Sequence, residues 1–334
     1  MFESNRLPAR PISYVPQVIS SLGKKAQKRF VTFFTDKYRN KNTRAAYHRN
    51  ACQFFEWCQV RELVFPDIES YHVSAYVEEM LEAGKAKRSV KQHLATIRKL
   101  FDWLIVGQIC SYNPAQAVEG PKVSAKKGVT PYLGEDSASE FLKSIDVSTV
   151  IGLRDRALIA LMTFSFARIS AAVAMNIDDY YQVGKKWKIN LHEKGGKQHD
   201  MPAHHKLEEY LDTYIEAAGG FEAFPEEPKQ GKKKPKRPLF RTTRGRSGEL
   251  TNRRMSRHDA WYMIKRRAAA AGLRLAISNH SFRATGITNY MDKGGDLKKA
   301  RDMANHASTK TTAIYDHSGD DITLDEVERI TIGS

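Results

Sequence analysis

The chain has 334 residues, which is enough for two domains with cores of their own. Lys and Arg number 54 against 38 Asp and Glu, so the formal net charge is +16. This excess favours a polyanionic partner such as nucleic acid, although a merely soluble basic protein stays open. Three cysteines without metal-ligand spacing argue against a disulfide framework or a zinc site. No run of about 18 apolar residues occurs, so we expect a soluble, intracellular protein without a membrane partner.

The first third of the chain predicts a helical domain behind a short arm. Residues 1–20 contain three prolines and predict a flexible N-terminal arm. Residues 21–118 predict helices, because apolar residues recur there at steps of three and four. Two stripes show this rhythm: Tyr47, Ala51, Phe54 and Cys58, then Val90, Leu94, Ile97, Phe101 and Leu104. Basic residues flank the second stripe, and we expect them to contact nucleic-acid phosphates, with a solvated face as the alternative. They are Lys87, Arg88, Lys91 and Arg98.

The remainder predicts a second domain over residues 131–334, after a linker at 119–130 that is rich in Gly, Pro, Ser and Lys. Residues 134–176 and 204–217 show helical patterns. Between them, Trp187, Ile189 and Leu191 alternate with polar residues, and a Gly-Gly pair precedes a second run that ends at Met201. This pattern indicates a β-hairpin. The predicted fold is therefore mainly α (α+β), with a small antiparallel β-sheet in the second domain.

Residues 225–237, PEEPKQGKKKPKR, form a low-complexity basic segment. Such a composition cannot bury a core, so we expect a loop. Its lysines Lys232, Lys233 and Lys234 are candidates for contact with the nucleic-acid backbone. The segment also resembles a nuclear localisation signal, a pattern that often arises from charge alone.

An anion is expected near one arginine, and a short His-x-x-Arg motif holds a second. Arg168 lies between two apolar stretches, and arginine is rarely buried without a partner. The alternative is a helix-end arginine whose head reaches solvent. His280 and Arg283 are three residues apart, so at a helix start both side chains project from one face. A solvent-facing pair is the alternative for this short motif.

A histidine and a tyrosine follow near the end of the chain. His306 and Tyr315 are nine residues apart and would face opposite ways on one unbroken helix. Ser308 offers an N-cap that starts a new helix between them, and such a break lets the two converge. The alternative is a core tyrosine beside an unrelated histidine. Lys194 and Lys197 flank the hairpin glycines, where lysine also occurs for solubility.

Together these residues suit the cleavage of a phosphodiester. That reaction needs a nucleophile, positive groups for the non-bridging oxygens and an acid for the leaving oxygen. Tyr315 supplies the nucleophile, and Arg168 with Arg283 binds the phosphate, because guanidinium favours bidentate contacts.

The other three predicted catalytic residues handle protons and position the phosphate. Lys194 protonates the leaving 5′-oxygen. His280 accepts the tyrosine proton or positions the phosphate, and His306 hydrogen-bonds to the phosphate. No metal and no cofactor is needed for these roles.

The order of these residues resembles that of the tyrosine recombinases, also called the phage integrase family. The resemblance spans residues 131–317, and residues 21–118 look like the family's core-binding, SAM-like domain. It implies a two-domain clamp on double-stranded DNA, a 3′-phosphotyrosyl intermediate, a free 5′-hydroxyl and no ATP. It also implies a homotetramer that exchanges strands through a Holliday junction. The matching residues are Arg168, Lys194, His280, Arg283, His306 and Tyr315.

Three positions depart from the family pattern. Ala167 and Asn305 stand where glycine is usual, and Ala171 stands where an acidic residue is usual. These departures predict a divergent subfamily, and we expect an integrase of a mobile element in a prokaryotic cytoplasm, associated with the nucleoid. Accessory DNA-bending proteins or a partner recombinase are possible partners. The tail at 318–334 docks through residues 322–330 either on a neighbouring protomer or on its own subunit.

Three other functions remain open from the sequence. A type IB topoisomerase shares this chemistry but relaxes DNA without pairing two sites. A non-catalytic DNA-binding protein with a decayed site is the second, and a basic nucleoid-binding protein is the third. The intact set of six residues favours the recombinase.

Overall fold

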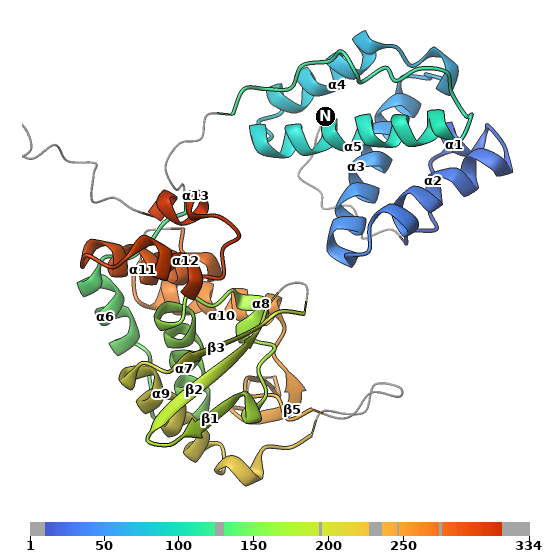
Figure 1. Ribbon diagram of the computed structural model, residues 1–334. Coiled ribbons are helices and arrows are strands. Elements are labelled where there is room, and N and C mark those ends of the chain that lie inside the picture. Colours follow the sequence, from blue (N-terminus) through green and yellow to red (C-terminus); the bar gives the residue numbers. More distant parts are fainter. Residues whose placement is uncertain are drawn as a thin grey trace, which may run out of the picture. The chain divides into compact units, whose positions relative to one another are not determined.

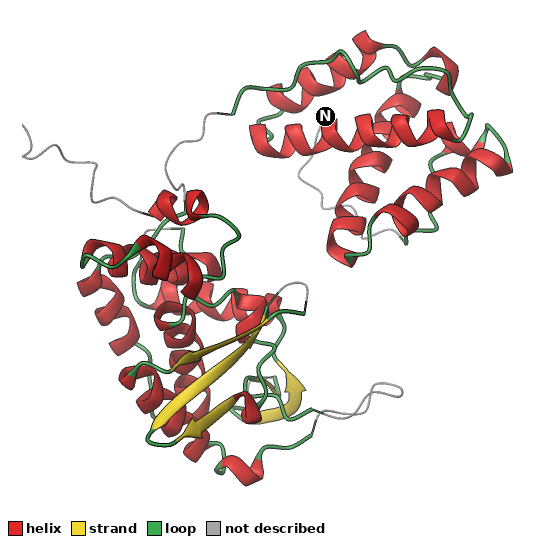
Figure 2. Cartoon of the chain, viewed as in Figure 1, coloured by secondary structure: helices red, strands yellow, loops and turns green. Residues whose placement is uncertain are grey.

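The computed structural model describes residues 11–123, 130–193, 196–226, 236–245, 247–273 and 276–315. The chain divides into two compact units, Met1–Ala125 and Lys126–Ser334, and this division lies within the 119–130 segment expected to be a linker. Figure 1 draws both units, and Figure 2 shows helices in the first and helices with small sheets in the second. The predicted fold class is confirmed. Within the described ranges, no helix has the length and apolar character needed to cross a membrane.

The first unit is a helical domain with an aromatic core. Both predicted apolar stripes face this core, with all members buried except Tyr47, which packs at its edge. The rings of Phe54 and Phe101 meet edge to face there, with centroids 6.4 Å apart. Cys52 and Cys58 are buried and are not joined in a disulfide, so they fill the core. The elements are α1 (Gln17–Ser20), α2 (Lys24–Lys37), α3 (Lys41–Val60), η1 (Phe65–Asp67), α4 (Ser70–Glu82) and α5 (Lys87–Val106).

The chain before α2 differs from the expected arm. The prediction of a flexible arm over residues 1–20 is wrong for its last part, because Gln17–Ser20 form α1. Val18 and Ile19 are buried, and α1 packs against α2 and α3. Pro16 occupies the N-cap position, where its missing N–H removes no helical hydrogen bond. Residues 1–10 lie outside the described residues.

The second unit is built around α7, which packs against α6, α9 and α11. Most of α7 is buried, as expected for its dense apolar sequence. Gly286 on α11 permits close approach to α7, since a Cβ there would overlap the carbonyl oxygen of Thr163. The helices of this unit are α6 (Glu135–Lys143), α7 (Val150–Phe164), α8 (Ile169–Ala172), α9 (His205–Ala217), α10 (Arg257–Ala270), α11 (Asn279–Asp292), α12 (Leu297–Met303) and α13 (Thr309–Thr312), with 3₁₀ turns η2 (Ile177–Asp179), η3 (Phe221–Ala223) and η4 (Ala313–Tyr315).

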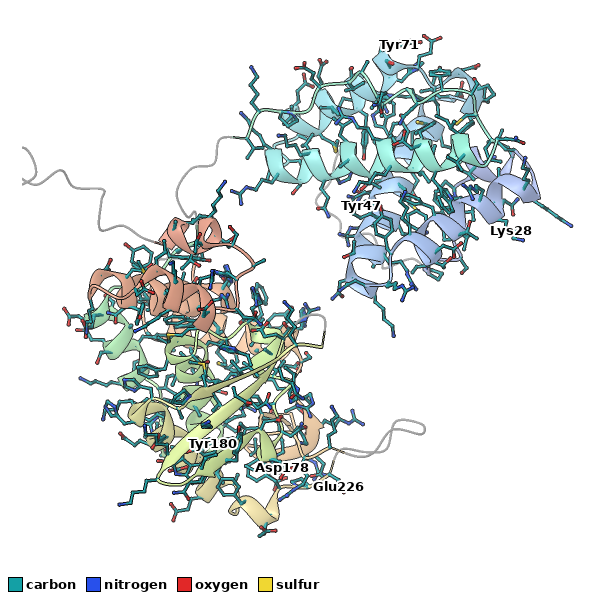
Figure 3. The ribbon with its side chains drawn as sticks, in the orientation of Figure 1. Lys28, Tyr47, Tyr71, Asp178, Tyr180 and Glu226 are labelled. Atoms are coloured by element: carbon teal, nitrogen blue, oxygen red, sulfur yellow. The ribbon has the colours of Figure 1, made fainter. Side chains whose placement is uncertain are left out.

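A three-stranded antiparallel sheet covers part of this helical core. Strands β2 (Lys186–His192) and β3 (Gln198–Pro202) form the predicted hairpin, with Ile189 opposite Met201. The sequence pattern missed β1 (Tyr180–Val183), which pairs with β2, and the separate pair β4 (Arg241–Thr243) and β5 (Leu250–Arg254). Tyr180, labelled in Figure 3, starts β1 and donates its hydroxyl to Asp212 Oδ1 of α9 over 2.8 Å. This bond ties the sheet to the helices beneath it.

A buried ion network joins α7 to α10 and β4. Asp155 is fully buried on α7, and its two carboxylate oxygens pair with Arg154 at 2.5 Å and with Arg267 of α10 at 2.9 Å. Arg154 also donates to the carbonyl oxygen of Arg241 over 2.8 Å. A buried carboxylate requires such partners, because an unpaired charge is costly to desolvate. The network therefore fixes α10, which directly precedes α11 in the chain.

Candidate active site

Tyr315 lies in η4, where a break in the helices brings it beside two histidines. Ser308 caps α13 by accepting a hydrogen bond from the backbone N–H two residues on, so the predicted break before Tyr315 is confirmed. Tyr315 is 8% exposed, and its Oη lies 3.1 Å from His280 Nε2. The rings of His306 and Tyr315 stack with centroids 6.3 Å apart. His306 Nδ1 lies 2.9 Å from Thr312 Oγ1 of α13, which fixes that ring.

The first turn of α11 presents the second part of the site. Ser278 caps this helix in a reciprocal arrangement with Ser281, so the helix begins directly before His280. His280 and Arg283 then lie one turn apart. The expectation that both project from one face agrees with this position, since both approach Tyr315. His280 does so through its hydrogen bond, and Arg283 is close enough that its charge opposes the rise that desolvation causes in the tyrosine pKa.

Arg283 is buried and held by the main chain. It is 1% exposed, and its two terminal nitrogens donate to the carbonyl oxygens of Phe166 and Ala304. These carbonyls come from the segment before α8 and from the end of α12. Nε of Arg283 is also buried and has no hydrogen-bond acceptor among the described residues. Such an unsatisfied cationic donor is a position where an anionic oxygen of a ligand would fit.

Arg168 approaches the same place from the N-cap position of α8. Its Nη1 donates to Glu193 Oε2 over 2.8 Å, and its Nη2 donates to the carbonyl oxygen of Asn305 over 3.2 Å. The side chain remains 35% exposed. Figure 1 shows α8 near the turn end of β2 and β3, which places Glu193 within reach. Sequence reasoning missed Glu193 as a site residue.

Two residues with left-handed backbone help to aim these carbonyls. Phe166 has φ of +53° and Asn305 has φ of +46°. Their segments supply the carbonyl oxygens that accept from Arg283 and Arg168. Asparagine tolerates this conformation better than other residues with a side chain, and glycine tolerates it best. The departure from the family's usual glycine at position 305 is therefore one that the backbone accommodates.

Positive charge and burial set the protonation of the site. The pKa of His306 falls to about 4, first because the ring is desolvated and then because Arg283 and Arg168 are near. The pKa of His280 is lowered by the same causes, although part of this residue remains exposed. Desolvation raises the pKa of Tyr315, against the opposing effect of the two arginines. Both histidines are thus neutral near pH 7, so His280 Nε2 is able to accept a proton from the Tyr315 hydroxyl.

Comparison with known proteins agrees with this geometry. The model of the phage integrase family matches residues 131–321, and the model of its N-terminal SAM-like domain matches residues 28–107. The chain belongs to the phage integrase family. It is therefore a tyrosine-type, site-specific DNA recombinase. This assignment favours the recombinase over the topoisomerase and over a non-catalytic DNA-binding protein.

Individual relatives of this integrase-family chain support the assignment. Tyrosine recombinase XerD of Listeria monocytogenes is 27% identical over 283 residues, which cover 83% of this chain and 88% of that protein. The structure of the XerH recombinase bound to its palindromic difH substrate covers 92% of this chain and 84% of that one, with a TM-score of 0.69 and 19% identity. A lambda integrase tetramer bound to a Holliday junction covers 91% and 82%, with a TM-score of 0.65 and 17% identity.

The other predicted site residues are only partly described. Lys194 lies outside the described residues, as do Lys232, Lys233, Lys234 and the tail at 318–334. Lys87, Arg88 and Lys91 are exposed on or near the first turn of α5, and Lys197 is exposed directly before β3. They remain candidates for DNA contact.

Arg98 differs from the other predicted DNA-binding residues because two of its nitrogens are bound within the first unit. Its Nε donates to the carbonyl oxygen of Ala115 over 2.9 Å, and its Nη2 donates to that of Val118. These contacts hold the segment after α5 against the core of the first unit, where both of those residues are buried. Arg98 therefore stabilises the first unit. The periodicity of one helix does not reveal acceptors that lie 17 and 20 residues away.

Proposed function

We propose that Tyr315 is the nucleophile that cleaves one DNA strand, with Arg168, Arg283, His280 and His306 around the scissile phosphate. One observation carries the proposal: the Tyr315 hydroxyl lies 3.1 Å from His280 Nε2, and Arg283 and Arg168 are close enough to affect its ionisation. Desolvation raises the pKa of Tyr315, and the positive charges of Arg283 and Arg168 oppose that rise, as expected for cations near the hydroxyl. A tyrosine that only packs in the core does not require two arginines and a neutral histidine around its hydroxyl.

In the proposed reaction, Tyr315 Oη attacks phosphorus and its proton passes to His280. Arg283 and Arg168 bind the non-bridging oxygens, where negative charge grows in the transition state. His306 donates a hydrogen bond to the same phosphate. A 3′-phosphotyrosyl bond forms while the bond from phosphorus to the 5′-oxygen breaks, so the bond energy is kept for rejoining.

The departing 5′-oxygen requires a proton, and we assign this role to Lys194. It follows Glu193 directly in the chain, and Glu193 contacts Arg168. The liberated 5′-hydroxyl, or that of another strand, later attacks the phosphotyrosine and releases Tyr315. These residues supply every charge and proton that the reaction needs, so a chelator should leave cleavage unchanged.

For the biological role, we propose an integrase of a mobile element that acts on the nucleoid in a prokaryotic cytoplasm. Four protomers would pair two sites and exchange strands, in the way that the tetramer of lambda integrase on a Holliday junction suggests. Accessory DNA-bending proteins or a second recombinase would assist. The basic residues proposed for phosphate contact are Lys87, Arg88, Lys91, Arg98, Lys197, Lys232, Lys233 and Lys234.

Covalent trapping tests this proposal. The purified chain is incubated with nicked fragments of the DNA that flanks its gene, and protein–DNA adducts are isolated under denaturing conditions and sequenced. Wild type and Tyr262→Phe, which changes an exposed tyrosine in the same unit, should form the adduct. Tyr315→Phe should bind the fragments but form none. An adduct with Tyr315→Phe would assign the nucleophile elsewhere.

A further inference from the structure

Glu193 is a buried carboxylate at the site that none of the proposed steps uses. Its side chain is 4% exposed, and it follows the last residue of β2. Burying a carboxylate is unfavourable unless a cation or hydrogen bonds compensate for the lost water. Here the compensating group is Arg168, whose Nη1 lies 2.8 Å from Glu193 Oε2.

This pairing fixes the plane of the Arg168 guanidinium. Glu193 holds Nη1, and the carbonyl oxygen of Asn305 holds Nη2 at 3.2 Å, from a different segment. A guanidinium has five N–H donors, so these two contacts leave the others free for phosphate oxygens. The carboxylate thus orients Arg168 without occupying its whole binding edge.

The same residue also stabilises the hairpin. The backbone N–H of Glu193 donates to the carbonyl oxygen of Lys197 over 2.8 Å, which closes the turn between β2 and β3. Helix α8, which Arg168 caps, has the sequence ISAA and carries no acidic residue of its own. The carboxylate for Arg168 therefore comes from the hairpin instead of from the helix that Arg168 starts.

The negative charge of Glu193 also acts on Arg283. Desolvation by burial lowers the pKa of Arg283, the charge of Arg168 lowers it further, and the charge of Glu193 opposes both effects. One carboxylate beside two arginines leaves the site positive, as a phosphate requires, while it reduces the repulsion between the two cations.

We propose that Glu193 is the positioning residue for Arg168 in strand cleavage, and that it sets the orientation in which this arginine meets the scissile phosphate. The inference rests on the proposed function, in which Arg168 binds that phosphate. Glu193 itself touches neither the phosphate nor the nucleophile.

Single-turnover cleavage of the duplex recovered through the Tyr315 adduct tests the inference. Glu193→Gln keeps the shape but loses the charge, and Glu193→Ala loses both. Misplacing a catalytic group by about 1 Å lowers rates by on the order of 100-fold, so we expect Glu193→Ala to approach that loss and Glu193→Gln to lose less. Glu216→Gln makes the same chemical change on the exposed face of α9 and should leave the rate unchanged.

Two readouts separate positioning from a general effect on folding. A methylphosphonate at the scissile position has no negative charge for Arg168 to bind, so wild type and both Glu193 variants should cleave that duplex at similar rates. In an Arg168→Ala background, Glu193→Gln should cause no further loss, because residues that act as a unit are not additive.

The outcomes are distinct for each hypothesis. Wild-type rates in both Glu193 variants, or an equal loss on both duplexes, would overturn the positioning role. In either case the proposed function stands as long as wild type forms the adduct and Tyr315→Phe does not. An adduct with Tyr315→Phe would instead overturn the proposed function, whatever Glu193 does.

Discussion

Arg283 should contribute to stability as well as to catalysis, and the two contributions are separable. Its two terminal nitrogens donate to the carbonyls of Phe166 and Ala304 inside the protein. Hydrogen bonds to a charged group contribute about 1.5–3 kcal/mol each, so Arg283→Met should lower the free energy of unfolding of the second unit by roughly 3–6 kcal/mol. That is a large share of the roughly 5–15 kcal/mol that stabilises a typical domain. Arg283→Lys keeps the charge but replaces the planar guanidinium with a single ammonium nitrogen, so an intermediate loss is expected.

Native-state hydrogen exchange with mass spectrometry measures this effect. Peptides of α7 and α11 report the opening free energy of the second unit, and peptides of α3 and α5 serve as the internal reference. Arg266→Met removes an exposed arginine from α10 and is the matched control, for which little change is expected. Wild-type opening free energies in α7 and α11 of Arg283→Met would refute the idea that this arginine clamps the two segments.

Three further predictions concern pH and backbone conformation. Cleavage should remain fast as the pH falls through 6.5 and should decline only below it, because desolvation and the nearby arginines lower the pKa of His280. Single-turnover cleavage rates measured against pH test this. An acidic decline at or above pH 6.5 would contradict it. Burial lowers the pKa of His93 to about 3, so the unfolded chain binds the extra proton between pH 6.5 and 3. As the pH decreases through that window, the free energy of unfolding should decrease by up to about 1.4 kcal/mol per pH unit. Urea unfolding of His93→Gln should lack this contribution to the pH dependence. Asn305→Gly should retain cleavage and thermal stability, whereas Asn305→Val should lose about 1–2 kcal/mol and cleave slowly, as melting curves and adduct assays would show.

The helical domain was predictable because burial follows the period of a helix. The stripe from Val90 to Leu104 is buried throughout, as its spacing required. The catalytic candidates were predictable for another reason, since phosphodiester cleavage requires particular chemical groups. The structure brings together Arg168, His280, Arg283, His306 and Tyr315, which lie within η4, α11 and the segments that flank α8 and α12.

The features that the sequence did not reveal depend on contacts between distant segments. Strand β1 is only four residues long, and its burial follows no clear alternation. Glu193 lies beside lysines and glycines in a turn, where a carboxylate usually faces solvent, and its partner Arg168 is 25 residues away. Arg98 has the spacing of an exposed residue, yet its acceptors come from the chain after α5. Periodicity describes one segment at a time, so it does not detect such pairs.

The anchoring of the two arginines has a consequence for how such a site changes over evolutionary time. Arg283 is tethered through the peptide groups of Phe166 and Ala304, and Arg168 partly through that of Asn305. Every residue type carries a carbonyl, so neighbouring side chains are free to drift as long as the local chain path persists. The side chains of the residues that supply these carbonyls should therefore tolerate substitution wherever the replacement keeps the local backbone conformation, and engineers who redesign this region need to preserve that path above all.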